Sequence, residues 1–161
     1  GGIGLSANQV GLPYRMFVMG GHQDMEDGKA RACWNPEILE FSEETIMLSE
    51  GCLTYPLLFL QVSRPKTCKV KYTDNDGKEY IEDLDHMPSR VFQHEFDHMN
   101  GTDFTKLVSK FKLDRAKEKV RKIYEQEKKL APKTIQLAKK IKKEIDEKKT
   151  GVIKPNTDII V

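Results

Sequence analysis

The sequence has few cysteines and no long apolar run, which argues against a disulfide-built scaffold and against a membrane-spanning helix. Only Cys33, Cys52 and Cys68 occur in 161 residues. An odd number of widely spaced cysteines argues against a disulfide-built scaffold and favours a reducing compartment, with the cytoplasm as the expected location. No apolar stretch approaches the roughly 20 residues of a membrane-spanning helix. The first ten residues lack a signal-peptide pattern, and no repeat or low-complexity tract occurs, so we expect no membrane among the partners.

Charge is unevenly distributed along the chain. With 38% hydrophobic and 32% charged residues, the composition fits one compact domain with an appendage. Residues 106–150 hold 17 Lys/Arg and 7 Asp/Glu, a net charge of +10, whereas the rest carries −8. Such a basic segment favours an anionic partner such as RNA, although a solvated lysine-rich helix face would have the same composition. We expect a basic amphipathic helical extension over 112–150 and a tail over 151–161, and no specific DNA partner.

Turn signals and apolar periodicity predict most of the secondary structure. The expected elements are a strand over 15–19, a polar loop over 20–28, an apolar start over 32–34 closed by a turn at 35–36, a hairpin pairing 67–73 with 78–84, and a helix over 87–100. Pro88 fits the first turn of that helix and Gly101 its end. Beyond Phe111, apolar residues at helical spacing predict one helix that ends before Pro132 and a second helix after it.

The segment His94-Glu95-Phe96-Asp97-His98 on the predicted helix indicates the chemistry. Two imidazoles four residues apart lie on one helix face and can bind one metal ion. Glu95 lies beside such an ion, where it can move a proton to or from metal-bound water. A thiolate from Cys52 would complete three ligands and leave a fourth position open. The pattern therefore predicts a catalytic site for metal-assisted hydrolysis.

Other interpretations of these residues stay open from the sequence alone. The histidine pair could be structural. The chain could also be a non-catalytic ribosome- or RNA-binding module that retains the metal site for stability. In some zinc endopeptidases a glutamate about twenty residues later is the third ligand, and Glu118 stands at that distance from His98. The lysines around Glu118 favour a solvated surface instead. Cys52 follows Glu50-Gly51 and precedes Leu53-Thr54-Tyr55-Pro56, which indicates a turn that orients its side chain. Cys33 and Cys68 have no such context, and we expect them in the core.

Three segments in this order resemble the signature motifs of the peptide deformylases: GIGLSANQ at 2–9, EGCLT at 50–54 and HEFDH at 94–98. Asn35-Pro36, Arg64-Pro65 and the residues from Arg90 to Gln93 extend the likeness over about residues 2–111. It implies an α+β fold with small antiparallel sheets around a central HExxH helix, in a catalytic domain over 1–111 that is short at its N-terminus. Ser6 and Thr54 stand where the family usually has alanine and serine.

The resemblance also implies an activity. It implies a metal-dependent hydrolase that removes the N-formyl group from the N-terminal formyl-methionine of nascent polypeptides by attack of a metal-bound water. The family's usual metal is Fe(II), which zinc, nickel or cobalt can replace; a Cys/His/His ligand set by itself favours zinc. In some relatives the C-terminal helix docks on the ribosome, which makes the ribosome a further expected partner of the basic extension.

Carried over by motif position, the resemblance assigns roles to individual residues. The metal ligands would be Cys52, His94 and His98. Glu95 would transfer the proton, and the Gln9 side-chain amide with the Leu53 backbone N–H would hold the oxyanion. The substrate-binding residues would be Ile3, Gly4, Leu48, Glu50, Met87 and Val91, of which the apolar members, with Leu53, would wall a methionine pocket.

Overall fold

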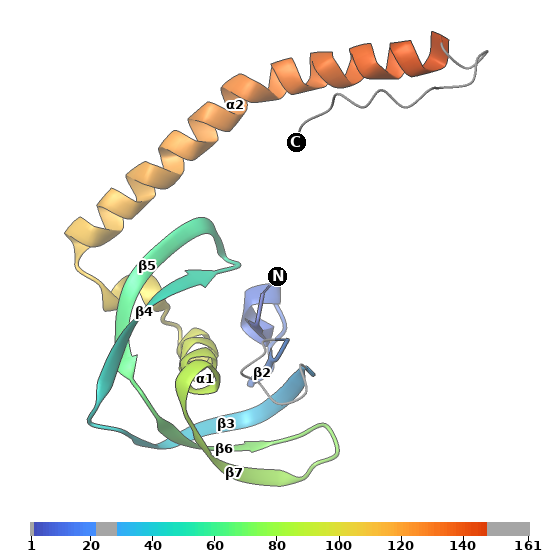
Figure 1. Cartoon of the computed structure of the whole chain (residues 1–161). Helices are drawn as coiled ribbons and strands as arrows, with labels where there is room; N and C mark the ends of the chain where they lie inside the picture. Colours follow the sequence, from blue (N-terminus) through green and yellow to red (C-terminus); the bar gives the residue numbers. More distant parts are fainter. Residues whose placement is uncertain (1, 22–28, 148–161) are drawn as a thin grey trace. The chain divides into compact units, whose positions relative to one another are not determined.

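The computed structural model describes residues 2–21 and 29–147, with side chains up to Lys143 (Figure 1). The predicted tail over 151–161 and most of the predicted loop over 20–28 lie outside the described residues. The chain divides into two units at Lys117 and Glu118, a few residues beyond the boundary drawn from the sequence. Each unit is described by itself.

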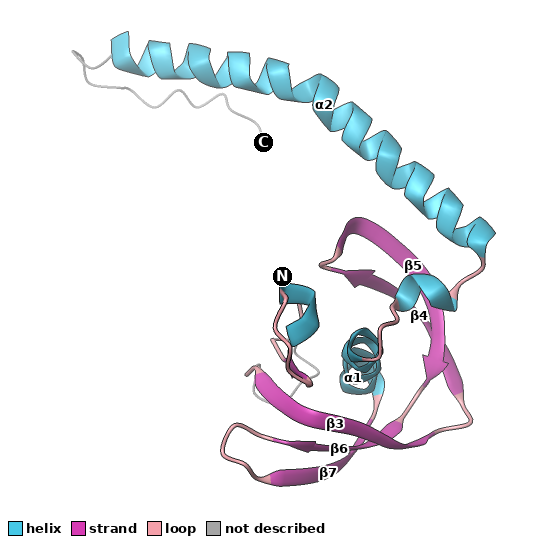
Figure 2. Ribbon diagram, turned by 180° about the vertical axis from the view of Figure 1, so that it is seen from behind, coloured by secondary structure: helices cyan, strands magenta, loops and turns pink. Residues whose placement is uncertain are grey.

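The first unit contains a five-stranded antiparallel sheet and a two-stranded ribbon. Along the large sheet the order is β1 (Gly4–Ser6), β2 (Met16–Met19), β3 (Arg31–Phe41), β6 (Cys68–Thr73) and β7 (Glu79–Leu84). The ribbon pairs β4 (Thr45–Cys52) with β5 (Tyr55–Pro65). Helix α1 (His86–Met99) lies between the sheet and the ribbon (Figures 1 and 2). This confirms the α+β fold, with small antiparallel sheets around a central helix.

The core fills the space between α1 and the five-stranded sheet. Strand β6 alternates buried and partly exposed residues, the period-two pattern of a strand with one face on a core. Phe17 of β2 meets Phe92 of α1 edge to face, with ring centroids 4.9 Å apart. Cys33 and Cys68 are buried in this core, as predicted. The hairpin expected around residues 74–77 is confirmed by the pairing of β6 with β7.

Helix α1 begins and ends where its local sequence predicts. The Asp85 carboxylate accepts a hydrogen bond from the first backbone N–H of the helix, that of His86 (2.6 Å). Pro88 stands in the first turn, where a backbone N–H has no partner within the helix. Gly101 follows the C-cap with φ 71°, a left-handed conformation that glycine adopts without strain. The element differs from the prediction by one residue at each end.

The predicted turn at Asn35-Pro36 is wrong, because strand β3 runs through both residues. Its register against β6 shifts between Trp34 and Glu37, and Asn35 has φ 47°. Proline has no N–H to donate to a neighbouring strand, and a bulge tolerates this loss. The turn-forming residues therefore bend a continuous strand instead of ending it.

The predicted helix end before Pro132 is also wrong. Helix α2 runs without a break from Lys110 to Glu147 with Pro132 inside it. An internal proline removes one hydrogen bond and crowds the carbonyl four residues before it, but lysine, glutamate, alanine and leucine on both sides are strong helix formers. Two short 3₁₀ helices, η1 (Ala7–Val10) and η3 (Phe104–Leu107), complete the elements used below. Among the described residues, no helix combines the length and apolarity that a membrane span requires.

Leu57 of β5 has an unusual backbone and provides a stability test. Its φ is 65°, whereas its neighbour Leu58 has no positive φ. The left-handed region costs a residue with a side chain about 1–2 kcal/mol, a cost that glycine avoids. We expect Leu57→Gly to leave the free energy of unfolding within about 1 kcal/mol of the parent value, because relief of strain offsets lost packing.

The matched control is Leu58→Gly, since Leu58 is buried. We expect it to lower the free energy of unfolding by about 2–5 kcal/mol in urea denaturation. An equally large loss for Leu57→Gly would contradict the strain argument.

Candidate active site

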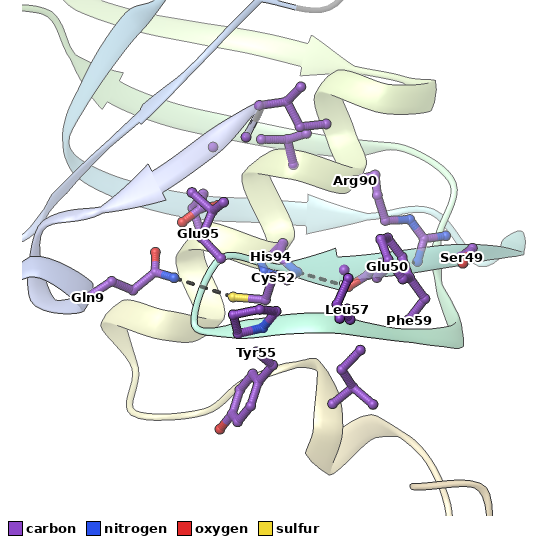
Figure 3. A pocket seen from close by; sticks show the side chains of 18 of the residues that line it. Gln9, Ser49, Glu50, Cys52, Tyr55, Leu57, Phe59, Arg90, His94 and Glu95 are labelled. Atoms are coloured by element: carbon purple, nitrogen blue, oxygen red, sulfur yellow. Dashed lines mark hydrogen bonds and ion pairs between the residues drawn. The ribbon is translucent and has the colours of Figure 1, made fainter. Parts of the chain in front are cut away.

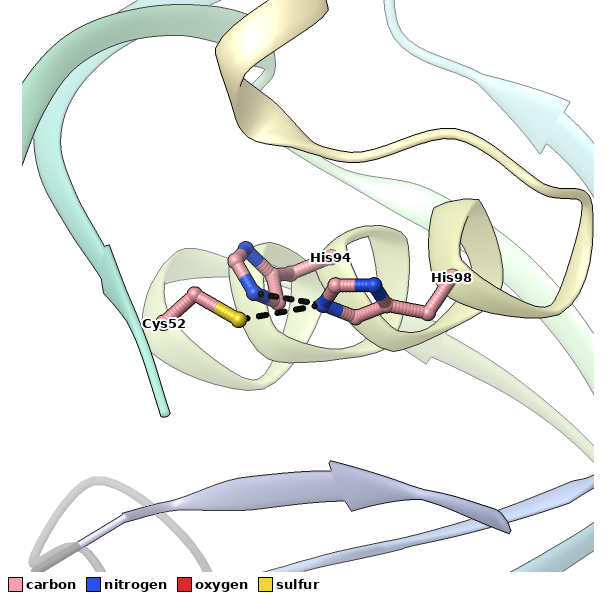
Figure 4. Close-up of side chains that lie close together, drawn as sticks. All are labelled: Cys52, His94 and His98. Atoms are coloured by element: carbon pink, nitrogen blue, oxygen red, sulfur yellow. Dashed lines mark hydrogen bonds between the residues drawn. The ribbon is translucent and has the colours of Figure 1, made fainter. Parts of the chain in front are cut away.

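Three side chains with metal-binding atoms converge between β4 and α1 (Figure 4). Cys52 is the last residue of β4, and His94 and His98 lie one turn apart on α1. The Cys52 Sγ lies 3.2 Å from the Nε2 of His98, which lies 3.3 Å from the Nε2 of His94. Within the described part of the chain, no other group of three or more such side chains converges in this way. The structure thus brings together the three residues expected as ligands.

The distances and the donor chemistry both fit one cation. Zinc-to-nitrogen and zinc-to-sulfur bonds of about 2.0 and 2.3 Å place tetrahedral ligand atoms roughly 3.3–3.5 Å apart. Burial alone would raise the pKa of Cys52, but hydrogen bonds with His94, His98 and Thr54 outweigh it and lower the pKa to about 5. The thiolate is the form that binds metals. The residues therefore fit the metal on which this class of site depends.

Glu50 orients one of the three converging side chains. Its Oε2 lies 3.0 Å from the His94 Nδ1, which leaves the Nε2 of that ring facing Cys52 and His98 (Figures 3 and 4). Arg64 and Arg90 each donate to Glu50 Oε1 at 2.7 Å, and Arg64 also donates to Oε2 at 3.1 Å. The sequence suggested Glu50 as a substrate contact; the structure places its carboxylate on two arginines and a histidine, although the residue still lines the cavity described below.

The Glu50 network predicts a pH-dependent contribution to stability. Burial alone would raise its pKa, but hydrogen bonds from His94, Arg64 and Arg90 lower it to about 2 from the usual 4.5. A depressed pKa stabilises the folded state above about pH 4.5, and that stability is lost as the pH falls toward 2. We expect Glu50→Gln to lower the free energy of unfolding by about 3 kcal/mol at pH 7 and by much less near pH 2.

Urea denaturation at both pH values measures this difference. Glu44→Gln is the control, because Glu44 is 68% exposed where it pairs with Lys66 and we expect no measurable change. A Glu50→Gln effect that is the same at both pH values would contradict the assignment.

Glu95 lies beside the three converging side chains, with its carboxyl group buried against β1. The Ser6 hydroxyl donates to its Oε2 at 2.9 Å. Burial raises the pKa of Glu95, opposed by His94, by this hydrogen bond and by His98. A side chain at Gly4 would overlap the Glu95 Oε1 and lie 2.9 Å from Val91 Cγ1. Gly4 therefore lets the backbone of β1 come close to the carboxyl group.

One of the two predicted oxyanion donors, Gln9, lies against the sulfur. The Gln9 Nε2 donates to Cys52 Sγ at 3.4 Å and to Thr54 Oγ1 at 2.9 Å, so that its amide points toward Cys52 (Figure 3). Leu53 follows Cys52 directly and is 58% exposed. Both residues line one cavity.

This cavity has a volume of about 440 Å³ and is walled mainly by apolar side chains, a size typical of small-ligand sites. The expected wall residues Ile3, Leu53, Met87 and Val91 line it, as do Gly4, His94 and Glu95. Leu48 does not; it lines a neighbouring cavity together with Ile46 and Met87. Strand β5 adds wall residues that sequence reasoning missed: Tyr55, Pro56, Leu57, Leu58 and Phe59. No local signal assigned these residues to the cavity wall, since only the pairing of β4 with β5 brings them there.

Glu118, the alternative third ligand, is engaged elsewhere. Its carboxylate pairs with Arg121 of the same helix at 2.8 Å. Among the described residues, the converging ligand group contains Cys52 and not Glu118. The zinc endopeptidase interpretation is not favoured.

Comparisons with known proteins agree with this site. The model of the polypeptide deformylase family matches residues 1–114. The chain is 44% identical over 121 residues to the peptide deformylase of Hyphomonas neptunium, which covers 75% of this chain and 69% of that protein. It is 48% identical over 100 residues to that of Thermotoga maritima, covering 62% and 58%. The chain thus spans only part of the length of these curated relatives.

Solved structures give the same result. The peptide deformylase of Ehrlichia chaffeensis matches with a TM-score of 0.68 and 40% identity, over 78% of this chain and 75% of that one. The peptide deformylase of Synechococcus elongatus in complex with actinonin matches with a TM-score of 0.66 and 34% identity, over 73% and 63%. Sequence, fold and site agree: the chain belongs to the peptide deformylase family.

Proposed function

We propose that this chain hydrolyses the formyl amide of N-terminal formyl-methionine in nascent polypeptides. One observation carries the proposal: Cys52, His94 and His98 converge beside the buried Glu95 at an apolar cavity. The likeness to peptide deformylases over more than two thirds of the chain supports the choice of substrate.

The cavity and its edges suit a formylated methionine. Ile3, Met87 and Val91 offer an apolar wall for the methionine side chain. Strand β1 is the edge strand of its sheet, so the backbone of Gly4 can pair with an extended peptide. The Gln9 amide and the Leu53 N–H are the donors for the formyl oxygen as negative charge develops on it.

The chain's residues also account for the proton transfers. When bound, a divalent cation supplies a Lewis acid and lowers the pKa of coordinated water. Glu95 takes a proton from the attacking water and returns it to the departing amine as the C–N bond breaks. Formate and a free N-terminal amine are the products, and Cys52, His94 and His98 hold the cation throughout.

The identity of the metal and two further assignments are part of the same proposal. Membership of the family supports Fe(II) in the cell, with zinc, nickel and cobalt as replacements, although a thiolate with two imidazoles also suits zinc.

The three free cysteines support a cytoplasmic location. The basic composition of α2 supports contact with the ribosome, which would show as co-sedimentation that weakens as salt is raised.

Formate release tests the proposed function. Protein loaded with Fe(II) or Ni(II) is given a formyl-Met-Ala-Ser peptide, and both formate and internal cleavage products are measured. We expect formate without internal cleavage. Full metal loading without formate release would overturn the proposal, and cleavage inside the peptide would favour an endopeptidase.

A further inference from the structure

Ser6 joins two groups of the site that are far apart in the sequence. It is the last residue of β1 and is fully buried, with 0% of its surface exposed. Its hydroxyl lies 2.9 Å from Glu95 Oε2 and 2.8 Å from Gln9 Oε1. The hydroxyl therefore lies between the residue assigned to proton transfer and the residue assigned to the oxyanion.

On one side, Ser6 fixes the orientation of the Gln9 amide. The backbone N–H and the hydroxyl of Ser6 both lie 2.8 Å from Gln9 Oε1. With its oxygen held there, the amide directs its Nε2 at Thr54 and Cys52. The opposite orientation would place the amide NH₂ against the backbone N–H of Ser6, two donors facing each other. The serine thus keeps the donor end of Gln9 toward the metal ligands.

On the other side, Ser6 fixes the Glu95 carboxyl group. One oxygen, Oε2, bonds the hydroxyl, and the other, Oε1, lies where a side chain at Gly4 would have to be. The Ser6 hydroxyl carries one hydrogen, which it can share between Glu95 Oε2 and Gln9 Oε1, because both oxygens lie within hydrogen-bond reach of it.

We propose that Ser6 is a positioning residue that couples Glu95 to Gln9, so that the proton-transfer group and the oxyanion donor are held in one arrangement. The inference rests on the proposed deformylase activity.

Ser6→Ala tests the inference through a split between kcat and KM. We expect kcat for a formyl-Met peptide to fall about tenfold, the rate equivalent of losing one hydrogen bond to a charged group. KM and the bound metal should stay close to those of the parent, because the substitution removes one oxygen and no wall of the cavity. In a Gln9→Ala background, Ser6→Ala should cost clearly less than tenfold, since part of its effect acts through Gln9.

Ser89→Ala is the matched control. Ser89 is equally buried, and its hydroxyl contacts Cys68 Sγ and Gln93 Nε2 rather than Glu95. We expect it to lower the melting temperature with kcat unchanged.

Three results would overturn the role of Ser6: a kcat within twofold of the parent, a full tenfold loss in the Gln9→Ala background, or a fall in activity that follows loss of metal. If the parent protein itself releases no formate, the proposed function fails first and the coupling fails with it.

Discussion

Glu95→Gln should lower kcat for formyl-peptide hydrolysis by about 10²–10⁴-fold, the usual contribution of a positioned acid–base group. Glutamine has nearly the same shape and can still accept a hydrogen bond from the Ser6 hydroxyl, but it cannot take a proton from water at neutral pH. Because Glu95 lies beside the three converging ligands and not among them, the variant should keep its metal. Formate release and metal content, measured on the same preparation, check both expectations.

Asp97→Asn is the matched control for this change. Asp97 is also an acidic residue of α1, but its carboxylate pairs with Arg64 at 2.7 Å. We expect a small loss of stability and a kcat within a few-fold of the parent. A Glu95→Gln variant that retains more than a tenth of the parent kcat would show that another group transfers the proton.

Cys52→Ala should abolish formate release by removing the metal. The two imidazoles that remain bind a cation much more weakly than a thiolate with two imidazoles, and we expect the affinity to fall by more than about 100-fold. Competition with a chelator, followed by metal analysis, measures the affinity. Retention of one tightly bound metal per chain would contradict the ligand set.

Two variants separate this effect from general damage. Cys33→Ala removes a thiol that is buried in the core and absent from the ligand group, so it should lose stability and keep its metal. Glu118→Ala should keep both metal and activity, because that carboxylate pairs with Arg121 on its own helix. Loss of metal in Glu118→Ala but not in Cys52→Ala would revive the endopeptidase interpretation.

Local signals predicted well wherever neighbours in the chain decide the structure. The α-helical period places His94 and His98 on one face of α1, and Pro88 and Gly101 stand near its two ends. The same signals failed at two prolines. Pro36 lies within a bulged strand, because pairing with the neighbouring strand outweighs the local preference for a turn. Pro132 lies within a helix, because strong helix formers on both sides outweigh the local preference to end it.

By itself, then, the sequence indicated metal-assisted hydrolysis. The evidence was a helical histidine pair with a glutamate between the two residues, a cysteine in a predicted turn, and three motifs in the order of one family. Only the tertiary structure decided how these parts meet. In the structure the Cys52 sulfur lies at the two imidazole rings, and Glu50 contacts Arg64 and Arg90. Leu48 lines a neighbouring cavity. Ser6 lies between Glu95 and Gln9. The physical reason is sequence separation: these contacts depend on the register of β4 with β5 and on the packing of α1 against β1, which no local pattern encodes.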